Sequence, residues 1–161
     1  MKALPVITAL AVFLFLLNSI FIFEMVRSDE LRSFYFSGKE LSNLFSPDEV
    51  THMQEVKFLT MISITINAVL APIIIARRKE INRHQLGKYL LIASAVLFIA
   101  AIFFPIFFIL FHKVFFPFST TWLLPSNSFL IQTYPQSFFQ DRFLGIIFIA
   151  ASLGAVLRCK N

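Results

Sequence analysis

Four long apolar stretches constrain the fold of this chain more than any other feature. They comprise residues 3–23, 58–76, 90–111 and 143–157, and none of them contains Asp, Glu, Lys, Arg or His. A helix needs about 20 apolar residues to cross a bilayer, and the first three stretches satisfy that requirement. The fourth satisfies it if its helix begins near Pro135, because proline suits the first turn of a helix.

We therefore expect an all-α polytopic membrane protein in which residues 1–161 form a single domain. Of these residues, 58% are hydrophobic and only 14% are charged, so a soluble domain would lack the polar surface to cover its core. The first stretch resembles a signal peptide but has no small-residue cleavage site, and we interpret it as a retained span. The four predicted transmembrane helices cover about residues 3–23, 58–76, 90–111 and 136–157.

The basic residues predict how these helices are oriented. Eight of them lie at the chain ends and in the loop after residue 76, beside a single acid, Glu80: Lys2, Arg77, Arg78, Lys79, Arg83, Lys88, Arg158 and Lys160. The loops 24–57 and 112–142 hold six basic and eight acidic residues. Loops rich in Lys and Arg face the cytoplasm, so we expect both termini inside and the two longer loops outside. The clustering of positive charge in such loops argues against a nucleic-acid partner.

The two outer loops are unusually aromatic. Rings of this kind favour the headgroup region of a bilayer, where an apolar body and a polar edge are both accommodated. Two interpretations remain open, an aromatic belt at the interface and a lipid-lined pocket. The residues concerned are Phe34, Tyr35, Phe36 and Phe45 in the first loop and Phe115, Phe116, Phe118, Trp122, Tyr134, Phe138 and Phe139 in the second.

A helix that projects above the membrane carries the first candidate site residues. Ser46, Pro47 and Glu49 have the spacing of a capping box, which predicts a helix start. If that helix runs unbroken to Ala76, it is about 45 Å long, whereas the hydrocarbon core is only about 30 Å thick. Its first turns therefore lie outside the apolar boundary.

His52 and Glu55 share one face of this projecting part, because they are three residues apart. His112 ends the third apolar stretch on the same predicted side, whereas His84 lies in the inner basic loop. Three interpretations are open for His52 and His112. They are two independent interfacial histidines, a metal site completed by Glu55, or an acid–base pair, since a pKa near 6.5 lets histidine take and give protons. No serine nucleophile motif, glycine-rich phosphate loop or compact metal motif is present.

The segment from His52 to Lys57, HMQEVK, resembles the H-M-x-D/E-V-K signature of the Lit family of bacterial lipoprotein intramolecular transacylases. Glu55 stands where members often have aspartate, Ser128 stands near a place where they tend to carry an acid, and the first outer loop is short for the family. The resemblance covers about residues 46–141, and it continues through Phe111 to Phe116, Trp122, Leu130-Ile131, Tyr134-Pro135 and Phe138 to Asp141.

The resemblance implies an enzyme without a cofactor in the bacterial cell membrane, with its active site on the extracytoplasmic side. Its substrate would be a diacylglyceryl-cysteine lipoprotein, whose sn-2 acyl chain moves to the cysteine α-amino group to give an N-acyl lyso-form lipoprotein. His52 and His112 would be the catalytic acid and base. Glu55 would orient His52, Lys57 would stabilise a carbonyl or oxyanion, and Trp122 with the loop phenylalanines would shape the acyl pocket.

Two rival functions remain open on the sequence. The first is a non-enzymatic membrane accessory or scaffold protein, in which the histidines would tolerate substitution. The second is another lipid-acting membrane enzyme, possibly dependent on a metal.

Overall fold

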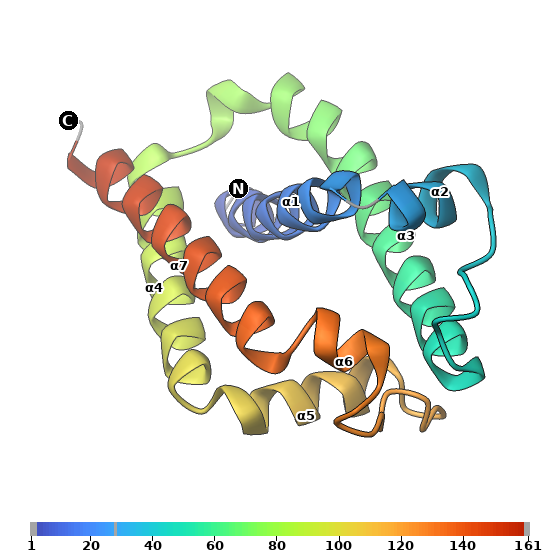
Figure 1. Cartoon of the computed structure of the whole chain (residues 1–161). Coiled ribbons are helices and arrows are strands. Elements are labelled where there is room, and N and C mark those ends of the chain that lie inside the picture. The colour runs from blue at the N-terminus through green and yellow to red at the C-terminus, as the bar shows by residue number, and fades with distance from the viewer. Residues whose placement is uncertain (1–2, 28, 160–161) are drawn as a thin grey trace.

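The computed structural model describes residues 3–27 and 29–159, and every regular element in them is a helix (Figure 1). This confirms the expected all-α class. The helices are α1 (Leu4–Arg27), α2 (Asp29–Ser37), α3 (Pro47–Ala76), the short 3-10 helix η1 (Arg78–Glu80), α4 (Arg83–Ile102), α5 (Phe104–Phe115), α6 (Phe129–Thr133) and α7 (Gln136–Cys159).

The helix starts that carry sequence signals are where we expected them. The Ser46 hydroxyl accepts the Glu49 N–H, and the Glu49 carboxylate accepts the Ser46 N–H at 2.6 Å, so the capping box is formed. From there α3 runs for 30 residues to Ala76. Likewise, α7 begins at Gln136, directly after Pro135.

Within the described residues, α3, α4 and α7 are long and apolar enough to cross a membrane. In α3 the apolar part is residues 58–76, and its earlier turns are polar. The apolar part of α1, Leu4–Ile20, is shorter than the other three. The chain is thus an all-helical protein with helices that fit a membrane, and the fourth crossing stays a prediction.

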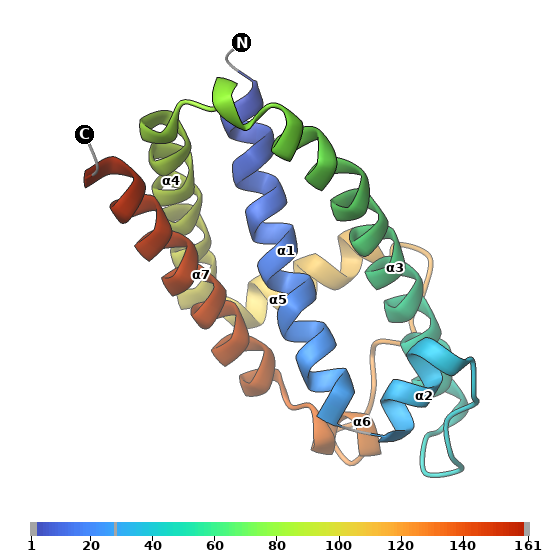
Figure 2. The same ribbon diagram turned by 90° about the horizontal axis from the view of Figure 1, so that it is seen from above.

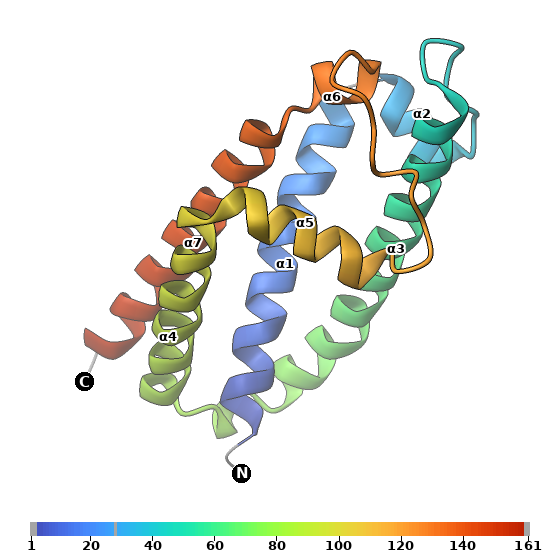
Figure 3. The ribbon, with the colours of Figure 1, turned by 90° about the horizontal axis from the view of Figure 1, so that it is seen from below.

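The third apolar stretch, residues 90–111, is divided between two helices. α4 ends at Ile102, Phe103 leaves the helical conformation, and α5 begins at Phe104 with Pro105 in its first turn. In a continuous helix Pro105 would lack a hydrogen-bonding N–H and its ring would clash with a carbonyl of the preceding turn. The 12 residues of α5 span only about 18 Å at 1.5 Å per residue. This helix therefore turns away from α4 and runs toward α3 (Figure 3).

α1 lies between α3 on one side and α4 with α7 on the other (Figure 1). α4 and α7 run side by side, and two buried glycines face each other across their contact. A Cβ atom on Gly87 would lie 2.6 Å from the Gly154 carbonyl oxygen. Small residues allow such close helix packing inside membranes. α1 and α3 are joined by a polar contact, in which the Ser63 hydroxyl donates to the Asn18 side-chain oxygen at 2.9 Å.

The two ends of the bundle differ in character. The start of α1, η1 and the end of α7 lie at one end, and α2 and α6 lie at the other (Figure 2). Of the eight basic residues that predict orientation, Lys2 and Lys160 lie outside the described residues, and the other six belong to the first end. The basic residues from which the orientation was predicted, as far as they are described, thus lie together at one end of the bundle.

At the other end, the first outer loop folds into a compact cap. Three of its four aromatic rings are buried there, which neither a simple belt nor a lipid pocket anticipated. α2, the following segment, the start of α3 and α6 share one hydrophobic cluster, made of Leu31, Phe34, Tyr35, Leu41, Phe45, Met53 and Leu130.

Candidate active site

His52 on α3 and His112 on α5 lie against each other. Their ring centroids are 5.6 Å apart with the planes tilted by 34°, and each residue is only 7% exposed. The rings meet because α5 turns toward α3 after the break at Phe103, bringing its third turn beside the early turns of α3. Two histidines separated by 60 residues of sequence therefore form one pair.

Glu55 lies beside His52, as their spacing predicted. Its Oε2 atom is 3.6 Å from His52 Nδ1, which is an electrostatic contact but too long for a hydrogen bond. Among the described residues, His52 Nδ1 has no hydrogen-bond partner. A carboxylate on this side favours a proton on Nδ1, so that Nε2 is the free base of the neutral ring.

The tautomer of His112 is fixed by its own helix. Its Nδ1 lies 2.7 Å from the Phe108 carbonyl oxygen, which can only accept a hydrogen bond. Nδ1 must therefore carry a proton, and Nε2 is the basic atom of the neutral ring. The ring is enclosed by Phe108 at 4.4 Å, Trp122 at 5.1 Å and Phe116 at 5.6 Å between centroids.

Burial favours the neutral form of both rings. Burial lowers the pKa of His52, and the nearby His112 lowers it further, against an opposing effect of Glu55. Burial also lowers the pKa of His112, while the Phe108 carbonyl acts in the opposite direction. Both residues lie outside the apolar part of α3 and outside α4 and α7. At neutral pH this pair is therefore ready to accept a proton.

The segment that follows α5 contributes residues that the sequence did not reveal. The hydroxyls of Ser119 and Thr121 both donate to Glu55 Oε2 at 3.0 Å. Trp122 packs on His112, and its indole N–H donates to the Ser119 carbonyl oxygen at 3.0 Å. No periodicity or motif marks these hydroxyls, because the segment is irregular and its partner lies more than 60 residues earlier in the chain.

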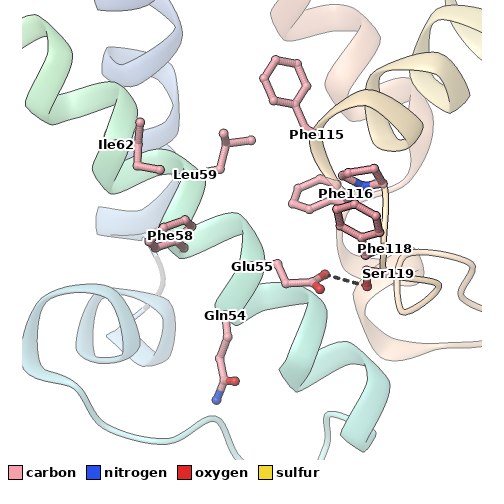
Figure 4. Close-up of a pocket in the computed structure, with 10 residues that line it drawn as sticks. Gln54, Glu55, Phe58, Leu59, Ile62, Phe115, Phe116, Phe118 and Ser119 are labelled. Atoms are coloured by element: carbon pink, nitrogen blue, oxygen red, sulfur yellow. Dashed lines mark hydrogen bonds between the residues drawn. The ribbon is translucent and has the colours of Figure 1, made fainter.

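A groove of about 590 Å³ adjoins the pair. One wall is α3 and the other is the end of α5 with the residues after it, and Glu55 points across toward Ser119 (Figure 4). Neither histidine lines the groove, but Phe116 both lines it and contacts the His52 ring at 5.3 Å. Its lining is mostly apolar: Gln54, Glu55, Phe58, Leu59, Ile62, Phe115, Phe116, Pro117, Phe118 and Ser119.

Lys57 is not brought to the histidine pair. Its ammonium group donates to the Phe34 carbonyl oxygen of α2 and lies 4.7 Å from the centre of the Phe34 ring. His84 is also remote, since it is exposed in the first turn of α4. In residues 3–27 and 29–159, no three His, Cys, Asp or Glu side chains are grouped so as to hold a metal ion.

Most of the chain matches the model of a known protein family. Residues 31–139, which contain the whole site, match the family described as lipoprotein intramolecular transacylase Lit. No curated protein and no solved structure gives a significant match to the chain.

Proposed function

The chain belongs to the Lit family of lipoprotein intramolecular transacylases, and on that premise we propose that it transfers an acyl chain within a diacylglyceryl-cysteine lipoprotein. The sn-2 chain moves from its glyceryl oxygen to the α-amino group of the N-terminal cysteine. The product is an N-acyl lyso-form lipoprotein.

The reaction needs positioning and proton transfer rather than a covalent enzyme intermediate. The ammonium group loses a proton, and the resulting amine attacks the ester carbonyl carbon. A C–N bond forms, the attacking nitrogen gives up a second proton, the C–O bond to the glyceryl group breaks, and the departing alkoxide takes up a proton. Because amine and ester belong to one molecule, holding them in attack geometry lowers the barrier by several kcal/mol, up to roughly 10.

The contact between His52 and His112 is the observation that carries this proposal. Two neutral imidazoles supply the base that takes the ammonium proton and, after protonation, the acid that protonates the alkoxide. Glu55 stabilises the imidazolium form of His52, and Trp122 holds the ring of His112. The proposal does not require a cofactor. The role of Lys57 in stabilising an oxyanion stays a prediction from the sequence.

The groove beside the pair suits the acyl chain. Its walls are phenylalanine and aliphatic side chains, and its polar end at Glu55 and Ser119 adjoins His52. The polar early turns of α3 and the basic opposite end of the bundle support an orientation with this site on the extracytoplasmic side of the cell membrane and both termini in the cytoplasm. The partners are then membrane lipids and the lipoprotein substrate.

Fragment-ion mass spectrometry of lipoprotein N-termini tests the proposal. Cells that express the chain should carry an acyl group on the cysteine nitrogen and lack the sn-2 ester, whereas cells without it should retain the ester. His52→Ala and His112→Ala should each abolish the conversion, because a base or an acid is lost. His84→Ala, at an exposed histidine remote from the site, is the matched control.

Three results would contradict the proposal. Full conversion by His52→Ala or His112→Ala would rule out the two histidines as the catalytic acid and base. Absence of conversion by the wild-type chain, with lipoproteins bound to it, would favour an accessory protein. Loss of conversion on treatment with a metal chelator would favour a metal-dependent enzyme.

A further inference from the structure

The residues after α5 reach both halves of the histidine pair. Ser119 and Thr121 bind the carboxylate beside His52, and Trp122 packs on the ring of His112. The segment is also tied to itself, since the Thr121 backbone N–H donates to the Ser119 hydroxyl oxygen at 3.3 Å and the Trp122 indole donates to the Ser119 carbonyl. A short irregular segment thereby connects two helices through their site residues.

One carboxylate oxygen, Glu55 Oε2, is in contact with three polar groups. Glu55 Oε2 accepts both hydroxyls at 3.0 Å and is also the oxygen of the ion-pair contact with His52 Nδ1 at 3.6 Å. A carboxylate oxygen has about two lone-pair sites, and the two hydroxyls occupy them. A charge-assisted N–H to carboxylate bond is normally about 2.8 Å long. The hydroxyls therefore hold Oε2 farther from His52 Nδ1 than a hydrogen bond to the ring would require.

We propose that Ser119 and Thr121 are positioning residues that restrain Glu55 from bonding His52 directly and so keep His52 weakly basic. This inference rests on the proposed function, in which His52 must be neutral to exchange protons with the substrate. In the part of the chain that the structure describes, the charged or titratable groups that face His52 are Glu55 on its own helix and His112 on α5. Phe116, the other ring against it, does not titrate.

The direction of the effect follows from simple electrostatics. Without the two hydroxyls, Glu55 Oε2 regains its lone pairs and is free to close the remaining distance to His52 Nδ1. Its negative charge is also no longer shared with hydroxyl donors. Both changes stabilise the imidazolium form, so His52 would hold its proton to a higher pH. A ring that is already protonated cannot take the proton of an ammonium group.

The experiment compares pH–rate profiles for the purified full-length protein acting on a synthetic diacylglyceryl-cysteinyl peptide. In the double variant Ser119→Ala/Thr121→Val, the acidic limb of the rate should move to higher pH by about 1 unit, the scale of one added ion-pair contact. Glu55→Gln should move the limb to lower pH. Adding the two hydroxyl deletions to Glu55→Gln should then produce no further shift, because the carboxylate through which they act is gone.

Ring titration by NMR gives a second readout that does not depend on catalysis. The His52 signals of labelled protein should titrate at a pH about 1 unit higher in the double variant than in the wild type. The signals are assigned by their loss in His52→Gln. Because this shift is measured without turnover, it tests the inference even if the proposed reaction is wrong.

Matched variants separate positioning from a general structural role. Ser126→Ala removes an exposed hydroxyl from the same segment and should leave the acidic limb where it is. Ser119→Ala/Thr121→Ser keeps one of the two hydroxyls and should show only part of the shift seen in the double variant. A double variant that is slower but keeps the wild-type limb and ring titration would overturn the proposal, as would a shift to lower pH.

Discussion

Glu49 links two distant helix starts, and its replacement provides a quantitative test of how the site is assembled. The side chain is 2% exposed. One carboxylate oxygen accepts the Ser46 N–H at 2.6 Å, and the other accepts the Leu130 N–H at 2.6 Å. Leu130 lies in the first turn of α6, where N–H groups have no partner within the helix. One carboxylate thus fixes α6 on the first turn of α3, one turn before His52.

The expected loss follows from the value of these bonds. A hydrogen bond to a charged group contributes about 1.5–3 kcal/mol. Glu49→Ala removes both bonds and should lower the protection of the Ser46 and Leu130 amides by roughly 10- to 150-fold each, because 1.36 kcal/mol corresponds to one factor of ten. Glu49→Gln keeps one acceptor oxygen, so one of the two amides should lose protection while the other retains it.

Hydrogen–deuterium exchange with mass spectrometry measures both amides in the same sample. Peptides that cover residues 43–50 and 128–134 report the two sites separately. Asp48→Asn changes the exposed neighbouring carboxylate and should alter neither peptide. The reasoning fails if Glu49→Ala leaves the Leu130 amide protected within about threefold of the wild type, since 0.7 kcal/mol is below the value of one such bond.

The same contact predicts how stability depends on pH. Burial raises the pKa of Glu49, but the N–H groups of Leu130 and Ser46 and the hydroxyls of Ser46 and Ser128 together lower it below its usual value. The ionised carboxylate therefore contributes full stability above its unfolded pKa, about 4.3. That contribution is lost as the pH falls through the lower folded value. Protection of the Leu130 amide should consequently weaken in acid in the wild type but not in Glu49→Ala.

Two further predictions concern the bundle and the groove. Gly87→Ala places a Cβ atom 2.6 Å from the Gly154 carbonyl oxygen and should lower the free energy of unfolding in detergent by about 1–3 kcal/mol. Gly145→Ala is the control, because its Cβ would meet nothing within 4 Å, and it should leave the free energy of unfolding unchanged or raise it. Ile62→Trp fills part of the groove and should slow transfer of a palmitoyl chain at least about tenfold more than transfer of an octanoyl chain, since each excluded methylene costs about 0.8 kcal/mol. Equal slowing of both chains would place the acyl chain elsewhere.

Local signals in the sequence predicted local structure well. The capping box located the start of α3, and Pro135 located the start of α7, because each signal depends only on neighbouring residues. The break at Phe103 had an equally local signal, Pro105, but apolar composition alone made residues 90–111 look continuous. The capping role of Glu49 was also visible, whereas its bond to Leu130, 81 residues later, was not.

The candidate site was predictable only in part for the same reason. His52 and Glu55 share a helix face, so their contact follows from spacing. The contact of His52 with His112 depends on the direction that α5 takes after its break, which spacing does not determine. Ser119 and Thr121 are ordinary hydroxyl residues in an irregular segment. Only tertiary structure places them on Glu55, and the Lit resemblance does not single them out.

The position of α1 has a consequence for the distance between the His52 and His112 rings. His52 belongs to α3, which packs along α1. His112 belongs to α5, which follows α4 and packs against α7 through the rings of Phe104 and Phe143. The two imidazoles thus belong to two different groups of helices, and α1 contacts both groups. A change in the tilt of α1 would therefore change the distance between the two imidazole rings, although α1 carries neither of them.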